Sequence, residues 1–213
     1  MNLNGKKINF LGDSITYGVG TSSPEKRFTR LIAAEEHLAE MRNYGISGTR
    51  IAPQHSVSSN REWDKDFISR VAEMDADADI VVVFGGTNDF GHGDAPFGSF
   101  TDRTADTFSG ACHVLMRTLR EKYADGTVVI LTPIHRRNED GMSRCGHPFI
   151  DYVNAIRQTA EYYALPVLDL YAESGLQPAL KTIRENYVPD GLHPNDAGHA
   201  LLTEKILAYL RAL

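Results

Sequence analysis

The stretch IVVVFGGTND, residues 80–89, decides how this chain folds. Its first half, Ile80–Phe84, is apolar at every position and rich in β-branched residues, which is typical of a strand buried on both faces. From Gly85 onward the sequence changes to glycine and small polar residues, so the strand ends there. A strand buried on both faces needs helices above and below it, and this predicts a parallel sheet in an α/β fold.

Four further segments predict strands of the same sheet: residues 8–11, 42–46, 128–131 and 167–170. Apolar residues at helical spacing occupy the segments between and after them, at residues 28–38, 67–74, 114–119, 150–156 and 201–210. This alternation predicts right-handed crossovers and an α/β/α sandwich of three layers around a five-stranded parallel sheet. No repeat or linker interrupts it, so we expect residues 1–213 to form one domain.

The composition is that of an ordinary globular protein, with 42% hydrophobic and 23% charged residues. A net charge of −6 argues against a nucleic-acid partner, which requires a basic patch for the phosphates. Cys112 and Cys145 lie in no CxxC motif, so we expect free thiols. No segment has the apolar length of a signal peptide or a membrane span, and we expect a cytoplasmic protein with no membrane partner. The sequence indicates no oligomeric state.

Small polar blocks follow the predicted strands. GDS (residues 12–14) follows the first, ISGT (46–49) the second and GTND (86–89) the third, while DGLHP (190–194) precedes the last helix. Ligands of open α/β sheets bind at the carboxyl ends of the strands. We therefore expect these four blocks to meet at one edge of the sheet.

The residue types in these blocks suit nucleophilic catalysis. A serine hydroxyl such as that of Ser14 is a weak nucleophile and needs a base within hydrogen-bond reach. His193 suits that role, and Asp190 is positioned three residues earlier to orient its ring. The oxyanion of a tetrahedral intermediate also needs donors, and the candidates are the backbone N–H groups of Ser14 and Gly48 and the amide of Asn88.

The four blocks resemble those of the SGNH (GDSL) hydrolase family, whose name lists its catalytic Ser, Gly, Asn and His. The resemblance extends from residue 8 to the last helix. It implies a flavodoxin-like sheet, with Ser14 as nucleophile, Gly48 and Asn88 in the oxyanion hole, His193 as base and Asp190 as its orienting acid. Members of the family are esterases, lipases, thioesterases and carbohydrate deacetylases that mostly need no metal, so we expect no cofactor and a small-molecule ester as substrate.

The long connections at residues 85–103 and 133–146 contain few large apolar side chains. A pocket for a long acyl chain needs a sizeable apolar surface. We therefore expect short acyl groups, above all acetyl on a carbohydrate, while lysophospholipid and thioester substrates remain open. Four residues beside the catalytic blocks or on these loops are expected to line the substrate pocket: Tyr17, Phe90, His92 and His135.

Other residues are expected to be structural. Arg136 and Arg137 are interpreted as a solvated loop in preference to an anion or sugar contact, and Trp63 as packing in preference to a sugar platform. Asp13 is expected to tie down its turn through backbone N–H groups.

Two other classes of function are considered. Metal-dependent phosphoesterases carry similar blocks, but their metal sites need clustered His and carboxylate ligands. This chain has no Asp-x-His near the first strand and no His-x-His near its end; inhibition by a chelator would favour that class. A non-catalytic binding module with this fold would be expected to lack a residue of the set Ser14, Asn88, Asp190 and His193, and all are present.

Overall fold

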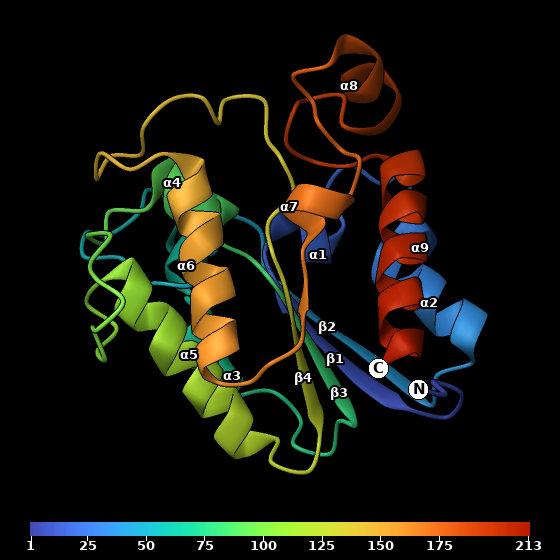
Figure 1. The fold of residues 1–213 in the computed structure, drawn as a ribbon. Coiled ribbons are helices and arrows are strands. Elements are labelled where there is room, and N and C mark those ends of the chain that lie inside the picture. The colour runs from blue at the N-terminus through green and yellow to red at the C-terminus, as the bar shows by residue number, and fades with distance from the viewer.

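Five parallel strands cross the centre of the molecule in the order β2-β1-β3-β4-β5 (Figure 1). The computed structural model describes residues 1–213. The strands are β1 (Lys7–Gly12), β2 (Glu40–Gly45), β3 (Ile80–Phe84), β4 (Thr127–Leu131) and β5 (Val167–Leu168). All five predicted strands are present and all pair in parallel, as expected of an α/β sandwich.

Helices cover both faces of this sheet (Figure 1). One face carries α3 (Phe67–Val71), α5 (Phe108–Lys122) and α6 (Phe149–Tyr162), and the other carries α2 (Phe28–Glu36) and α9 (Asp196–Ala212). Shorter helices lie in the connections: α1 (Ser14–Tyr17), α4 (Thr87–His92), α7 (Leu170–Glu173) and α8 (Lys181–Tyr187), with 3-10 turns η1 (Pro24–Lys26) and η2 (Arg61–Asp64). None of the helices combines the length and the apolar composition that crossing a membrane requires.

Strand β3 shows why the sheet is buried on both sides. Val81 and Val83 belong to the core cluster beneath α5 and α6, whereas Ile80, Val82 and Phe84 belong to the cluster beneath α2 and α9. Successive side chains of a strand point to opposite faces. Because apolar and polar residues do not alternate in β3, the strand packs against a hydrophobic core on each face of the sheet.

One predicted strand is shorter than expected. Residues 167–170 were predicted as a strand, and β5 ends at Leu168. The Asp169 side chain accepts a hydrogen bond from the N–H of Ala172 and so caps α7, and it also forms an ion pair with Arg157. An aspartate at this position starts a helix where apolar composition alone suggests a longer strand.

The strand order places a crevice above β1 and β3. Connections leave β1 toward β2 on one side and β3 toward β4 on the other, and ligands of doubly wound sheets bind at such a point. One residue, Asp13, separates β1 from α1, and two residues, Gly85 and Gly86, separate β3 from α4. The first and third polar blocks therefore stand side by side at the carboxyl edge.

Candidate active site

Ser14, His193 and Asp190 form a continuous chain of hydrogen bonds. Ser14 is the first residue of α1, and His193 lies in the loop between α8 and α9. Nε2 of His193 is 2.9 Å from Oγ of Ser14, and its Nδ1 is 2.7 Å from Oδ2 of Asp190. Two residues that are 179 positions apart in the chain are thus in direct contact.

The hydrogen-bond partners of Asp190 and His193 determine which atoms of this hydrogen-bonded series carry the protons. Burial would raise the pKa of Asp190, but hydrogen bonds from the backbone N–H groups and ring of His193 and from Leu192 outweigh it and lower that pKa below 3.8. The carboxylate therefore accepts from Nδ1–H of His193. The lone pair of Nε2 then faces the Ser14 hydroxyl, which is the arrangement that a general base requires.

Three residues that line one cavity carry hydrogen-bond donors. Ser14 opens α1, so its N–H has no acceptor within that helix. The N–H of Gly48 donates to no backbone acceptor. Nδ2 of Asn88 donates one hydrogen to the carbonyl of Thr49 at 2.9 Å, which orients the amide and leaves its second hydrogen free. Ser14, Gly48 and Asn88 line the same cavity.

The backbone conformation and surroundings of Gly48 favour glycine over residues with a side chain. Its φ is +77°, and a Cβ there would lie 2.3 Å from Cδ1 of Trp63. A side chain would therefore strain the backbone and displace the indole. Glycine allows the N–H to face the cavity with the indole packed behind it.

Two buried charges hold this loop against the sheet. Asp89 accepts from the N–H groups of Ile51 and Ala52 at 3.0 and 2.9 Å. Arg70 donates to the carbonyl of Gly12 at 3.2 Å and to Oγ1 of Thr49 at 3.0 Å. The turns that carry Ser14, Gly48 and Asn88 are therefore connected through polar side chains.

Asp13 has the structural position that the sequence predicts for it. Its carboxylate accepts from the N–H of Ile15 at 2.9 Å and caps α1. Asp13 is 1% exposed, and burial raises its pKa from 3.8 to about 6, against the hydrogen bond from Ile15 and the charge of His193. Its carboxylate forms no hydrogen bond with the Ser14 hydroxyl.

A cavity of about 330 Å³ opens above the Ser14 hydroxyl. Its lining residues come from α1, the loop after β2, η2, α4 and the loops after β4 and α8: Ser14, Val19, Ser47, Gly48, Trp63, Asn88, Gly91, His92, Arg136, Leu192 and His193. His92 lines the cavity, as the sequence predicts. No carboxylate does so.

The other three residues predicted to line the pocket do not line this cavity. Phe90 is 6% exposed and packs in the core against Phe149 and Tyr152, because it lies on the inner face of α4. His135 is outside the cavity, with Nδ1 2.6 Å from Oε1 of Glu139. Tyr17 is 47% exposed and lies beneath the guanidinium of Arg27 instead of in the cavity.

Two cavity residues were assigned to other roles from the sequence. Trp63 was interpreted as packing, and it does pack on Gly48, but it also lines the cavity. Arg136 was interpreted as part of a solvated loop, and it is partly buried with its guanidinium over the ring of Phe90. The sequence contains one signal for the position of this cavity. Asn88 and His92 are four residues apart, so they lie on the same face of α4, and that face is the one that lines the cavity.

No group of three or more His, Cys, Asp or Glu side chains is arranged to hold a metal ion. Asp13 and Asp89, the buried carboxylates of the GDS and GTND blocks, accept from backbone N–H groups of α1 and of the loop after β2. The residues present do not fit a metal centre.

Solved structures share the fold of this chain. A protein solved from Lactobacillus plantarum is 30% identical, with a TM-score of 0.85 and 98% of each chain covered. Another solved structure is 32% identical, with a TM-score of 0.88, covering 100% of this chain and 99% of the other. A candidate GDSL-like lipase from Bacteroides uniformis has the same fold at 19% identity, with a TM-score of 0.72 and 98% and 96% covered.

A comparison with curated protein sequences found no significant match. The model of the GDSL-like lipase/acylhydrolase family, by contrast, matches residues 10–201. This range contains all four polar blocks and every strand except the start of β1. The sandwich is the SGNH hydrolase fold, and the chain belongs to the GDSL-like lipase/acylhydrolase family.

Proposed function

We propose that the protein is a serine esterase that hydrolyses short-chain carboxylic esters through an acyl-enzyme. The observation that carries this proposal is the hydrogen-bonded chain from Asp190 through His193 to Ser14, with distances of 2.7 and 2.9 Å. A nucleophile, a base and a group that orients the base are the parts that acyl transfer by serine requires.

The reaction follows from these positions. Oγ of Ser14 attacks the ester carbonyl carbon as Nε2 of His193 accepts the hydroxyl proton. The oxyanion receives hydrogen bonds from the N–H groups of Ser14 and Gly48 and from the Asn88 amide. His193 then donates its proton to the leaving alkoxide as the carbon–oxygen bond breaks. Water attacks the acyl-Ser14 ester with His193 again as base, and the carboxylic acid leaves.

The size of the cavity supports a short acyl group. A volume of about 330 Å³ is at the lower end of the range for small-molecule sites, and it must accommodate both sides of the ester. Val19, Trp63 and Leu192 are its apolar lining residues. An acetyl ester of a carbohydrate fits this description better than a lysophospholipid or a fatty-acyl thioester. A series of para-nitrophenyl esters should have its optimum at acetate to butyrate; an optimum at long chains would favour a lipase or thioesterase.

The test of the reaction is turnover of para-nitrophenyl acetate by variants. Ser14→Ala and His193→Ala should each lower kcat by at least about 10³-fold, because the nucleophile or its base is lost. Ser59→Ala replaces an exposed serine outside the cavity and should retain wild-type kcat. Circular dichroism would verify the fold of each variant. Wild-type turnover by folded Ser14→Ala would contradict the proposal.

A further inference from the structure

The cavity has one wall whose polar side chains are all hydrogen-bond donors. We define this donor wall as Trp63, His92 and Arg136, which come from η2, α4 and the loop after β4. The rings of Trp63 and His92 are in contact, with centroids 5.3 Å apart. The indole N–H and the guanidinium can only donate. The role of the imidazole depends on its tautomer.

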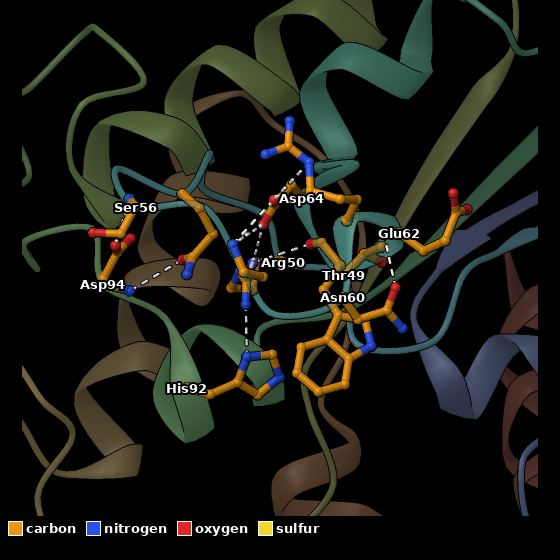
Figure 2. Close-up of polar contacts among 12 residues, drawn as sticks. Thr49, Arg50, Ser56, Asn60, Glu62, Asp64, His92 and Asp94 are labelled. Atoms are coloured by element: carbon orange, nitrogen blue, oxygen red, sulfur yellow. Dashed lines mark hydrogen bonds and ion pairs between the residues drawn. The ribbon is translucent and has the colours of Figure 1, made fainter.

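Arg50 fixes that tautomer. Figure 2 shows Arg50 between Asp64 and the ring of His92, with Nη1 2.6 Å from Nδ1 of the imidazole. A guanidinium has no acceptor, so Nδ1 must be the accepting nitrogen and Nε2 must carry the hydrogen. Burial, followed by the positive charges of Arg50 and Arg136, lowers the pKa of His92 from 6.5 to about 4. His92 is therefore neutral at pH 7 and offers an N–H to the cavity.

Arg50 is itself held firmly in this position. It is 1% exposed, and Nη2 donates to Oγ of Ser58, the carbonyl of Trp63 and Oδ1 of Asp64 at 3.0 to 3.3 Å. The same guanidinium thus fixes the backbone behind Trp63 and the ring of His92. Two members of the donor wall share one buried support.

Arg136 brings a positive charge that forms no direct ion pair with a carboxylate of the protein. Nη1 donates to the carbonyl and to Oγ1 of Thr87 at 2.7 and 3.2 Å, and Nε is buried with no partner. Glu139 contacts the backbone N–H of Arg136, and its other oxygen is bonded to His135. Burial lowers the pKa of Arg136 from 12.5, and the negative charges of Glu139 and Asp13 only partly oppose this, because neither carboxylate forms an ion pair with the guanidinium. A partly buried cation with no carboxylate bonded to it favours the binding of an anion.

We propose that the donor wall binds a carboxylate group of the ester substrate, with Arg136 as the charged partner and His92 and Trp63 as neutral donors. This inference rests on the proposed esterase function and specifies its substrate as an ester that also bears a carboxylate. The wall supplies donors and one positive charge, no carboxylate of the protein lines the cavity, and a carboxylate accepts from several donors at once. The carboxylate can belong to the acyl side or the alcohol side of the ester.

Arg136 also supports Thr87, the residue before Asn88, so an effect on turnover alone would not identify a binding role. The decisive quantity is a ratio of kcat/KM between two esters that differ only in charge. A purely structural role changes both values by the same factor and leaves the ratio unaltered. A binding role changes the ratio itself.

Two pairs of near-isosteric substrates provide this ratio. On the alcohol side they are para-acetoxybenzoate and para-acetoxybenzamide, and on the acyl side monoethyl succinate and ethyl succinamate. We expect wild type to favour the carboxylate of one pair by about tenfold or more in kcat/KM, the factor that a single charge-assisted hydrogen bond supplies. The pair that shows the preference identifies the side of the ester that carries the carboxylate. Added salt should reduce the preference.

Variants assign the preference to Arg136. Arg136→Gln should bring the ratio close to one, and Arg136→Lys, which keeps the charge, should retain part of it. Arg137→Gln is the matched control, since Arg137 is the exposed neighbour outside the cavity, and it should keep the wild-type ratio. A wild-type ratio near one in both pairs, or an unaltered ratio in Arg136→Gln, would overturn the donor-wall proposal while leaving the esterase function intact. Failure of wild type to hydrolyse any of these esters and para-nitrophenyl acetate would overturn both proposals.

Discussion

Asp190 is half-exposed, with 54% of its side chain accessible, yet three hydrogen bonds fix it. Oδ1 accepts from the N–H groups of Leu192 and His193 at 2.8 and 2.7 Å, while Oδ2 accepts from the ring. Carboxylate and imidazole thus belong to one tight turn, which positions the ring before substrate binds.

Asp190→Asn should therefore lower kcat for para-nitrophenyl acetate by about 10²–10⁴-fold, less than Ser14→Ala, because the base remains but its orientation and tautomer are no longer fixed. KM should change little, since Asp190 does not line the cavity. Steady-state kinetics on both variants measures the difference. Equal losses of kcat in the two variants would contradict a purely orienting role.

The buried carboxyl of Asp13 couples folding to pH. Its folded pKa of about 6 lies above the value of 3.8 for an unperturbed aspartate, so the folded state binds the proton more tightly. The stability contributed by this group is complete below about pH 4 and is lost as pH rises through 6. A pKa difference of about two corresponds to about 3 kcal/mol of unfolding free energy.

Asp13→Asn keeps an oxygen acceptor for the N–H of Ile15 and removes the titration. The unfolding free energy of wild type relative to Asp13→Asn should therefore fall by up to about 3 kcal/mol between about pH 4 and pH 7. Urea unfolding of both proteins across this range gives the comparison. If the unfolding free energies of the two proteins changed with pH in parallel, burial would not raise the pKa of Asp13, and this prediction would be contradicted.

At the scale of elements, the proposed oxyanion hole depends on how α4 holds the loop after β2. Asp89 in the first turn of α4 binds the N–H groups of Ile51 and Ala52, both of which lie in the same loop as Gly48. Without that carboxylate two buried donors lose their acceptor, each at a cost of about 1–3 kcal/mol, partly offset by removal of a buried charge. The loop would then be free to shift relative to Asn88.

Asp89→Ala should lower the unfolding free energy by about 2 kcal/mol and kcat by at least about tenfold. Asp94→Ala is the matched control. Asp94 also accepts from two backbone N–H groups of this loop, those of His55 and Ser56, but at exposed positions remote from Gly48. Chemical denaturation and steady-state kinetics measure both effects. Equal losses of kcat in the two variants would contradict the role of Asp89 in the oxyanion hole.

The sequence predicts the elements unequally. Strand β3 has the predicted bounds. All five of its consecutive residues are apolar, and they can all be buried only if both faces of the strand pack against a core. Helix α9 begins at Asp196, five residues before the apolar spacing at residues 201–210, because Asn195 caps it by accepting from the N–H of Gly198. Helix α4 was expected to be part of a loop, because Thr87-Asn88-Asp89 carries no apolar periodicity and its formation depends on Asp89 and Phe90 finding tertiary partners.

At the scale of the whole molecule, the strand order determines which residues meet. The order β2-β1-β3 brings the ends of three strands together, so that Ser14, Gly48 and Asn88 are neighbours in space, and the last connection adds Asp190 and His193. Their convergence was predictable because each block directly follows a strand or precedes a helix. The donor wall was not, since Trp63 and Arg136 lie in irregular connections and the support from Arg50 requires contacts with residues 8 to 42 positions away.

The central claim is that the Ser14 hydroxyl, activated by His193, is the atom that becomes acylated. The most direct measurement is labelling with an aryl phosphonate, which a serine activated in this way attacks, followed by mass spectrometry of the intact protein and its peptides. Wild type should acquire one phosphonyl group, located on the peptide containing Ser14, with loss of esterase activity in proportion to labelling; Ser14→Ala should remain unlabelled, and His193→Ala should label far more slowly. Stoichiometric labelling of another residue, or full inactivation with Ser14 unmodified, would contradict the account.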